Sequence, residues 1–515
     1  MAPIQSVAVI GAGISGVSSA AHLLRHGFEV VVFERSDVAG GVWHFDPRAD
    51  KDPEYPAGDS SEIESPSEYT KEITSETKDA VNDSEADILL AHAPPGPCYE
   101  GLMNNVPTRM MRSTLLEWPQ GTPDHVTHKE IETYVQELAR RTGAQDVTLY
   151  NTRVEEAIKR PETGRWSLRS RTLNKDEHGK ISFEEKDWTF DAVVVAAGHY
   201  HVPLIPHVPG LAEWKQKFPQ RVMHSKSYRY PAAFKGQNVF LIGAGVSSLD
   251  IAKELEGVAN KTYQSSRGGK FDLDASLLPT NSERVPGLKT FKLDEGKALE
   301  RDSDAPIPGT IHLTDGRILT DIHQVIVASG YQTTYPFLKG LESETIPYEE
   351  ADENIIITAD KCVTHNLHKD IFYIPDPTLS FVGVPYYTST FSMFDFQAEV
   401  VARVYAGLSN LPSEEIMKAQ YKARKANGAK GKEFHSLIQN QVPYMEDILG
   451  WANEGVEERG VERMRGVDEK WYEAYEEFKA ASRRLIPLDS KQIQQPIASK
   501  YYASGLPQKD QGIQT

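Results

Sequence analysis

The sequence predicts an α/β protein built around two copies of one β-turn-α-β unit. In the first copy, residues 7–33, an apolar strand leads into a glycine-rich turn, a helical segment and a second apolar strand. Residues 239–264 repeat this order. Each copy is followed further along the chain by a continuous apolar run with a small-residue end, at 191–198 and at 324–331. Such runs are typical of parallel strands that are buried on both faces.

The order of these strands predicts the domain arrangement. The closing strand of the first copy comes before the whole second copy, so we expect the second domain to be inserted in the first. We assign residues 1–212 and 336–455 to the first domain, 213–335 to the inserted domain, and 456–515 to a helical C-terminal extension with a tail.

The first glycine-rich turn, Gly11-Ala12-Gly13-Ile14-Ser15-Gly16, is a G-x-G-x-x-G dinucleotide fingerprint between a strand and a helix, which is the context it requires. Gly11 allows the tight turn, Gly13 lets a pyrophosphate approach the backbone, and Gly16 lets the helix pack on the strand. The pyrophosphate would sit at the helix N-terminus, where Ile14 and Ser15 offer free N–H groups.

The second strand of this unit ends on Glu34, followed by Arg35. A carboxylate at this position binds ribose hydroxyls and repels a 2′-phosphate, so the first site suits FAD or NAD and not NADP. A turn rich in glycine, Gly40-Gly41-Val42-Trp43, comes next. It is either a plain turn with one core aromatic residue or a cover over the adenosine or pyrophosphate.

The second fingerprint, Gly243-Ala244-Gly245-Val246-Ser247-Ser248, has a serine in place of the third glycine. Ser266 follows Ser248 by the same interval at which Glu34 follows Gly16, and Arg267 comes next. A guanidinium without an acid at this point can accept a 2′-phosphate through charge-assisted hydrogen bonds. Arg267 could also be an ordinary surface cation, but the spacing and the missing carboxylate favour NADPH.

Composition narrows the class of protein. The chain has 515 residues and a formal net charge of -18, which argues against nucleic acid or an anionic membrane as partner. It has no apolar run of about 18 residues, and the first strand starts too early to leave room for a signal peptide. The two cysteines form no C-x-x-C motif, so we expect no redox dithiol, no metal site and a cytoplasmic location.

Other segments are less regular. Residues 46–97 are rich in Asp, Glu, Ser and Pro, and we expect a surface insertion that is mostly mobile, with a lid as the alternative. Thr127 is a candidate N-cap for an amphipathic helix over 129–142. Three strand-like pieces at 148–150, 166–169 and 188–190 predict a β-meander, and a further helix is expected over 394–405.

Residues 218–228 run Phe-Pro-Gln-Arg-Val-Met-His-Ser-Lys-Ser-Tyr. They resemble the F-x-G-x-x-x-H-x-x-x-(Y/F/W) signature of flavin-dependent monooxygenases, with Gln220 at the glycine position. Together with GAGISG, GGVW, NNVP, GAGVSS, ASGY and YIPDPTLSFVG, they make the chain similar to the flavin-containing monooxygenase family, especially its microbial, fungal-type members, over about residues 5 to 415.

This resemblance implies an activity. NADPH would pass hydride to N5 of FAD, and the reduced flavin would bind O2 as a C4a-hydroperoxide, which bound NADP⁺ shields from water. A nitrogen or sulfur atom of a small nucleophilic substrate would then take up the oxygen, as in an N,N-dimethylaniline monooxygenase. The expected partners are this substrate and O2, with no nucleic acid and no membrane, and a homodimer is left open.

The resemblance also assigns roles. Asn105 in NNVP would face flavin N5 and is the expected catalytic residue, although a loop asparagine that caps backbone is an equal alternative. Asn104 stands where the family often has threonine, so which of the two matters is open. We interpret His224 and Tyr228 as linker residues between the domains and not as an acid–base pair.

The expected cofactor-binding residues come from both fingerprints and the loops around them. They are Gly11, Gly13, Ile14, Ser15, Gly16, Glu34, Arg35, Gly41, Val42, Trp43, Asn104, Asn105, Val154, Gly243, Gly245, Val246, Ser247, Ser248, Ser266, Arg267 and Gln397. Gln397 is on a helix whose N-terminus would approach the flavin pyrimidine oxygen.

Three other activities compete with this one. A Baeyer–Villiger monooxygenase inserts oxygen beside a ketone, but the signature of that group ends in tryptophan, where this chain has Tyr228. An NADPH-dependent flavin reductase would pass electrons to a quinone or a disulfide, and the missing C-x-x-C disfavours the disulfide. A non-catalytic, redox-sensing flavoprotein is disfavoured by the second nucleotide site.

Overall fold

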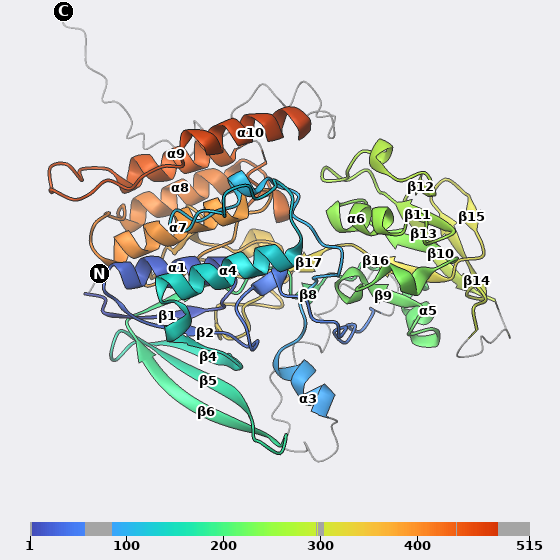
Figure 1. Cartoon of the computed structure of the whole chain (residues 1–515), viewed down its shortest axis with the longest axis horizontal. Coiled ribbons are helices and arrows are strands. Elements are labelled where there is room, and N and C mark those ends of the chain that lie inside the picture. Colours follow the sequence, from blue (N-terminus) through green and yellow to red (C-terminus); the bar gives the residue numbers. More distant parts are fainter. Residues whose placement is uncertain (1–2, 57–84, 295, 297–302, 439, 483–515) are drawn as a thin grey trace, which may run out of the picture.

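The computed structural model describes residues 3–56, 85–294, 296, 303–438 and 440–482. These residues form two α/β lobes that lie beside one another (Figure 1). The first lobe is built on a seven-stranded sheet and the second on a five-stranded parallel sheet. The predicted fold class, two Rossmann-like domains with the second inserted in the first, is confirmed.

The large sheet has the strand order β18-β19-β20-β7-β1-β2-β3. Val7 and Val9 of β1 point into one hydrophobic core, and Ala8 and Ile10 point into another on the opposite face. Both faces are therefore buried, which explains why the run is continuously apolar. The strands are β1 (Ser6–Ile10), β2 (Glu29–Phe33), β3 (Thr148–Leu149), β7 (Ala192–Val195) and β20 (Leu379–Phe381), which are mutually parallel, with β18 (Leu367–His368) and β19 (Phe372–Tyr373) antiparallel at the edge.

Helices cover one face of this sheet, where α1 packs on α7 and on α4 (Figure 1). The helix predicted over 129–142 is confirmed, with a capping box between Thr127 and Glu130 at its start. The helix expected to start at 394 begins four residues earlier, because the preceding Phe391 and Met393 are also buried in the core. The helices of this lobe are α1 (Ile14–Arg25), α3 (Glu85–His92), α4 (His128–Thr142), α7 (Thr390–Tyr405), α8 (Glu414–Ala426), α9 (Gln441–Ala452) and α10 (Glu469–Ser482).

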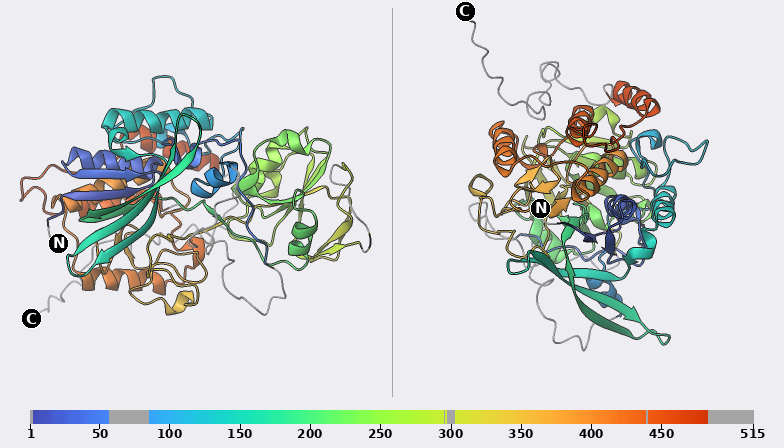
Figure 2. Two further views of the ribbon diagram at one scale, coloured as in Figure 1. Left: turned by 90° about the horizontal axis from the view of Figure 1, so that it is seen from below. Right: turned by 90° about the vertical axis from the view of Figure 1, so that its left-hand side faces the viewer.

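A separate antiparallel sheet of β4 (Thr152–Arg160), β5 (Arg165–Lys175) and β6 (Ile181–Phe190) packs on the other face, as Figure 2 shows. Leu168 and Phe190 from this sheet share a core with Ala8 and Ile10. The predicted meander is confirmed for its later strands. Thr148–Leu149, however, pairs with β2 and extends the large sheet.

The second lobe has the strand order β12-β11-β10-β16-β9. Leu211 and Trp214 of α5 share a core with Phe240 of β10, so this helix belongs to the lobe and the inserted domain begins slightly before the predicted residue 213. Its elements are α5 (Leu211–Lys217), β9 (Val222–His224), β10 (Asn238–Ile242), α6 (Val246–Glu254), β11 (Lys261–Ser265), β12 (Ser282–Val285), β16 (Gln324–Val327), and the antiparallel strands β13 (Leu288–Leu293), β14 (Gly309–Leu313) and β15 (Ile318–Leu319).

Two chain segments connect the lobes and lie side by side. Outgoing strand β8 (Val202–Pro203) pairs antiparallel with returning strand β17 (Tyr331–Gln332). This pairing is what an inserted domain requires, since the chain must leave and re-enter the first lobe. No helix of the described residues is long and apolar enough to cross a membrane.

The expectation of a mostly mobile insertion over 46–97 is wrong for residues 46–56. Asp50 forms a buried ion pair with Lys226, and Asp52 accepts a hydrogen bond from Lys215 at 2.8 Å. Tyr55 is 8% exposed and packs into the core of the second lobe. These acidic residues are buried because lysines of the second lobe neutralise them. Residues 57–84 lie outside the described part.

The other end of that segment is also anchored. His92 in α3 hydrogen-bonds through Nε2 to the carbonyl of Asn151 at 2.9 Å. Arg229 donates to the carbonyl of Gly96 at 3.1 Å. The prediction of a mobile segment rested on composition alone, and composition does not show which charged residues form pairs in the folded protein.

The predicted C-terminal extension is helical, but its helix α10 belongs to the core of the first lobe. Trp471 is fully buried, and its Nε1 donates to the Met110 carbonyl at 3.3 Å and to Ser392 Oγ at 3.2 Å. Trp471, Ala474 and Tyr475 form an apolar stripe at helical spacing in that core.

Candidate active site

The two fingerprints lie at the carboxyl ends of β1 and β10, which is where open parallel sheets bind ligands. Gly11 and Gly243 occupy equivalent positions, with φ of +104° and +113°. A Cβ atom on Gly11 would lie 2.6 Å from the Ala196 carbonyl oxygen, and one on Gly243 would lie 2.6 Å from that of Ala328. The neighbouring strand end therefore excludes a side chain from both turns.

The middle glycines lie at the helix N-termini and are not closely pressed by other parts of the chain. Gly13 is the N-cap of α1 and Gly245 the N-cap of α6, and in neither does a side chain cap the helix. A Cβ on Gly245 would meet nothing within 4 Å, and one on Gly13 would meet only Gly41, at 3.4 Å from its Cα. Both helices thus present uncapped N–H groups beside free volume, and this arrangement fits a pyrophosphate.

The third position differs between the two units. A Cβ on Gly16 would lie 1.7 Å from the Gly11 carbonyl oxygen, so only glycine fits there. Ser248 is fully buried at the matching position of the second unit, and its Oγ accepts a hydrogen bond from Gln264 Nε2 at 2.9 Å. The small serine therefore packs against the strand that follows.

Glu34 lies directly beside the first fingerprint. Its Oε2 accepts from the Ala12 N–H at 2.7 Å and its Oε1 from the Ser36 N–H at 2.9 Å. The carboxylate is 8% exposed, so these two bonds fix its orientation at the end of β2. Arg35 points elsewhere and contacts His201 Nδ1 at 2.6 Å.

The turn at residues 40–43 covers the N-terminus of α1. The Gly40 N–H donates to the Ala12 carbonyl at 3.1 Å. A Cβ on Gly41 would lie 2.8 Å from Gly13 Cα. Trp43 packs with its ring centre 6.5 Å from that of Phe391. The turn therefore combines both interpretations: its glycines lie over the fingerprint, and its aromatic residue packs on the core. Val42 lies between them and is partly exposed.

The ribose end of the second site contains a residue that the sequence did not indicate. Ser266 Oγ donates to Asp272, which also accepts from the Gly269 N–H at 2.9 Å. Arg267 is exposed next to them, as are Val246 and Ser247 in the first turn of α6. Asp272 is not part of the strand pattern; Gly268 and Gly269 turn the chain back so that it reaches Ser266. That glycine pair was the available signal.

The two loop asparagines have different surroundings. Asn104 is 4% exposed. Its Nδ2 donates to the carbonyls of Val106 and Asp124, both at 2.7 Å, and its Oδ1 accepts from the Val126 N–H at 2.6 Å. Asn105 is exposed. The side-chain amide of Asn104 already makes its hydrogen bonds within the loop, whereas the exposed side chain of Asn105 can contact a ligand.

The loop that carries these asparagines is anchored on the helix of the second fingerprint. Tyr99 OH donates to Asp250 of α6 at 3.3 Å. Gly101 packs so closely on Glu254 of the same helix that a Cβ would lie 1.7 Å from Glu254 Oε1. Tyr228 OH also donates to Glu254, at 2.8 Å. Tyr228 also packs on Tyr99, with ring centres 5.6 Å apart. It therefore lies where the second lobe meets the loop that carries the asparagines, which supports its interpretation as a linker residue.

His224 is likewise fixed between the lobes. Its backbone N–H donates to Asp52 Oδ1 at 3.0 Å, its Nδ1 accepts from the Lys226 N–H at 3.1 Å, and its Nε2 lies 3.1 Å from the Gly330 carbonyl. Burial lowers the pKa of His224 to about 4, so the ring is neutral at pH 7. Both ring nitrogens are engaged, and this geometry supports a linker role over acid–base chemistry.

Gln397 lies on the expected helix, α7, one turn further from its start than a helix beginning at residue 394 would place it. It lies about two turns inside α7 and is fully buried. Its Oε1 accepts from the Gly383 N–H at 3.0 Å and its Nε2 donates to Tyr444 OH at 2.7 Å. Because Gly383 packs against Ser15, Gln397 supports the first fingerprint from behind.

Val154 is buried in the core under the sheet, which leaves only its backbone for a cofactor contact.

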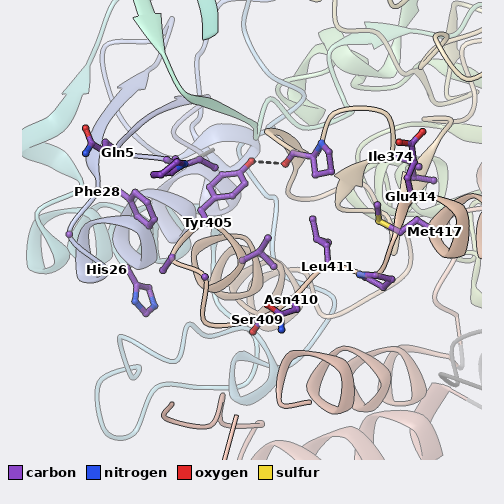
Figure 3. Close-up of a pocket in the computed structure, with 18 of the residues that line it drawn as sticks. Gln5, His26, Phe28, Ile374, Tyr405, Ser409, Asn410, Leu411, Glu414 and Met417 are labelled. Atoms are coloured by element: carbon purple, nitrogen blue, oxygen red, sulfur yellow. Dashed lines mark hydrogen bonds between the residues drawn. The ribbon is translucent and has the colours of Figure 1, made fainter. Parts of the chain in front are cut away.

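A groove of about 1170 Å³ lies away from these sites (Figure 3). Gln5, His26 and Phe28 line it, together with Tyr405 at the end of α7. Gln5 precedes β1 and His26 follows α1, so the groove is at the amino end of the central strand. Nucleotides bind at the opposite, carboxyl end, and the groove is therefore not the cofactor site.

Comparison with known proteins identifies the class. The model of the flavin-binding monooxygenase-like family matches residues 94–277 and 309–455, and that of an NAD(P)-binding Rossmann-like domain matches residues 9–69. The chain therefore belongs to the flavin-binding monooxygenase-like family. It is 41% identical to the flavin-containing monooxygenase ustF2 of Aspergillus flavus over 500 residues, which cover 93% of this chain and 98% of that protein.

Solved structures share the fold. S-allyl-L-cysteine S-oxygenase from Allium sativum superposes with a TM-score of 0.64 at 24% identity, over 93% of each chain. Cyclohexanone monooxygenase from Rhodococcus sp. Phi1, bound to NADP⁺, gives a TM-score of 0.51 at 12% identity, over 88% of this chain and 98% of that one. At these identities the likeness establishes architecture alone.

Family membership confirms the expected class of enzyme and its cofactors. The protein is a flavin-dependent monooxygenase with sites for FAD and NADPH, and its substrates are O2 and a small molecule. The residues described above fit both nucleotides. Each unit offers an uncapped helix N-terminus beside a glycine with space in front of it.

Proposed function

We propose that the protein uses NADPH and O2 to oxygenate a nitrogen or sulfur atom of a small molecule. The observation that carries this proposal is the unequal pair of nucleotide units. One presents the fixed carboxylate of Glu34 and the other presents Ser266 and the exposed guanidinium of Arg267. Bound FAD, once reduced, supplies the activation of O2. The chain itself has to bind, orient and shield the reactants.

NADPH is the proposed electron donor because the second unit can pair with a 2′-phosphate. Arg267 and the Ser266 hydroxyl stand where the first unit has Glu34. A guanidinium binds phosphate oxygens through short charge-assisted hydrogen bonds. Glu34 in the first site would repel the same phosphate. The difference in charge between the two sites therefore directs FAD to the first and NADPH to the second.

The chemistry of Asn105 and the identity of Tyr228 favour oxygenation of a heteroatom over ketone insertion. Transfer to a lone pair needs an electrophilic oxygen, which a neutral hydrogen-bonding group such as the exposed amide of Asn105 can hold without taking its proton. The signature tyrosine, Tyr228, already donates its hydroxyl to Glu254 and packs on Tyr99.

The test measures NADPH oxidation and product formation with one thioether, one tertiary amine and one cyclic ketone. Hydrogen peroxide is quantified in each reaction. We expect sulfoxide or N-oxide in proportion to the NADPH consumed. Faster conversion of the ketone to a lactone would instead establish a Baeyer–Villiger enzyme. Rapid reduction of a quinone under nitrogen, with no oxygenated product in air, would establish a reductase.

A further inference from the structure

Lys432 lies where the carboxyl ends of the two sheets face one another. Its Nζ approaches Gly330, just past β16, so closely that a Cβ on this glycine would lie 2.5 Å from it. On the other side, Nζ lies 6.0 Å from the ring centre of Tyr386. Tyr386 follows Gly383, which packs against Ser15 of the first fingerprint. The ammonium group is thus between the FAD side and the NADPH side of the molecule.

Within the described residues, no carboxylate pairs with Lys432. Other buried lysines of the chain do have such partners, as in the pairs of Lys226 with Asp50 and of Lys369 with Asp447. Burial lowers the pKa of Lys432, and the facing group that opposes this shift is the thiol of Cys362. A partly buried ammonium without a counter-charge is costly unless a ligand supplies one.

The backbone around Lys432 is held in place. Lys430 pairs with Glu349 at 2.5 Å, and Glu433 pairs with Lys270 of the second lobe. The second of these pairs joins the segment of Lys432 to the second lobe, whereas Lys430 and Glu349 both belong to the first.

A wall of aromatic rings runs from Tyr386 toward the second lobe. His199 lies 4.1 Å from Tyr386 and 4.3 Å from Tyr200 between ring centres, and Tyr200 lies 5.4 Å from Tyr331. Phe271 of the second lobe stacks on Tyr387 at 4.7 Å. Tyr200 and Tyr387 are 38% and 41% exposed, so part of each ring remains accessible to a ligand. Aromatic walls with one charged group are typical of small-molecule sites.

From this arrangement we propose that Lys432 binds the carboxylate of an acidic substrate, such as an amino-acid-like thioether or amine, while the aromatic wall holds its apolar part. This inference rests on the proposed function and specifies its substrate class. The phosphates of NADPH carry the same anionic oxygens, but Gly245 and Arg267 already provide their site. The experiment therefore measures the effect of Lys432 on binding of the substrate acid and, separately, on the KM for NADPH.

The first measurement needs no turnover. The oxidised holoenzyme is titrated with 3-(methylthio)propanoate and with the corresponding primary amide, and binding is followed by the change in flavin absorbance. A charge-assisted hydrogen bond gives about a ten- to hundredfold preference for the acid. We expect Lys432→Met to abolish this preference with the amide unaffected, and Lys432→Arg to retain most of it. Lys422→Met, which changes an exposed lysine of α8, is the matched control and should behave like the wild type.

The second measurement is steady-state turnover of both probes. Lys432→Met should raise KM for the acid about ten- to hundredfold, with kcat and the KM for NADPH unchanged. Equal binding of acid and amide to the wild type would overturn the proposal. So would a raised KM for NADPH in Lys432→Met, or an equal loss of kcat on both probes. A clear binding preference for the acid accompanied by peroxide alone, without sulfoxide, would keep this site and refute the proposed oxygenation.

Discussion

The two nucleotide-binding units have nearly the same backbone and different charged groups at their strand ends, Glu34 in the first and Arg267 with Asp272 in the second. Gly11 and Gly243 share a left-handed conformation, and each is pressed against the carbonyl of the neighbouring strand, Ala196 or Ala328. Even the loops return alike, since the Gly40 N–H donates to the Ala12 carbonyl and the Leu273 N–H donates to that of Ala244. In both units the end of the neighbouring strand lies so close that the first position of the turn must be glycine. The residues that follow the second strand of each unit differ, and these select the ligand.

The units also differ in how strictly glycine is required. Gly16 admits no side chain, because a Cβ would collide with the Gly11 carbonyl, yet the second unit accommodates Ser248 and uses its hydroxyl. At the middle position neither Gly13 nor Gly245 is pressed by the protein itself. The middle glycines are therefore the ones that the cofactor requires, and the outer glycines are required by the fold.

The largest expected effect follows from Gly13→Ala. The residue has φ of -72°, which alanine adopts without strain, and the added methyl group would make only an ordinary contact with Gly41. It would, however, occupy the space that the FAD pyrophosphate needs. We expect a folded protein that purifies without its yellow cofactor, measured by flavin absorbance per protein and by circular dichroism.

Gly245→Ala is the matched control in the other unit. It should retain FAD fully and raise the KM for NADPH about tenfold or more, because overpacking costs about 1–3 kcal/mol. If Gly13→Ala retained FAD, or if Gly245→Ala lost it, the assignment of the two units to the two cofactors would be wrong.

Arg267→Ala has the next largest expected effect. Removing the guanidinium should lower kcat/KM for NADPH by about ten- to hundredfold, the value of a charge-assisted hydrogen bond, and leave NADH nearly unchanged. Steady-state kinetics with both dinucleotides measure this difference. An equal loss with NADH would mean that Arg267 supports the loop and does not bind the 2′-phosphate.

Asn105→Ser tests the loop that links the two units. FAD content and the rate of flavin reduction by NADPH should stay the same, and a several-fold larger share of the NADPH consumed should end as hydrogen peroxide, because the shorter side chain holds the oxygen less well. The contrasting variant is Asn104→Ser. It should lower the free energy of unfolding by about 1–3 kcal/mol by leaving buried backbone groups unpaired. If Asn104→Ser raised the share of hydrogen peroxide and Asn105→Ser lowered the free energy of unfolding, Asn104 would be the residue that faces the flavin.

The sequence predicted those features that depend on local backbone constraints. Glycines at fixed intervals between a strand and a helix can be interpreted directly, so both fingerprints, Glu34 and the inserted domain were found. Features that depend on contacts between distant segments were missed. The burial of Asp50 requires Lys226, and that of Trp471 requires Met110 and Ser392; no pattern near any of these residues indicates its partner.

Asp272 is the most informative of the residues missed, because it places a carboxylate in the unit that was expected to lack one. It accepts from the Ser266 hydroxyl and from the Gly269 N–H, so it occupies donors that a 2′-phosphate would use. An incoming phosphate must displace this carboxylate or tolerate its charge, whereas the ribose hydroxyls of NADH could donate to it. The selectivity of the second unit is therefore a balance between Arg267 and Asp272.

Asp272→Asn should shift that balance with the smallest effect of the series. An amide keeps an acceptor for Ser266 and the Gly269 N–H but removes the like charge, and the interaction of exposed charges is worth about 0.5–1 kcal/mol. We expect kcat/KM for NADPH to rise about two- to fivefold and that for NADH to stay level or fall. Because the gain comes from charge, it should shrink as salt is raised to ~1 M, where the Debye length is about 3 Å. If both dinucleotides lost efficiency equally at every salt concentration, Asp272 would be a support of the loop, and Arg267 alone would account for the contrast between the two units.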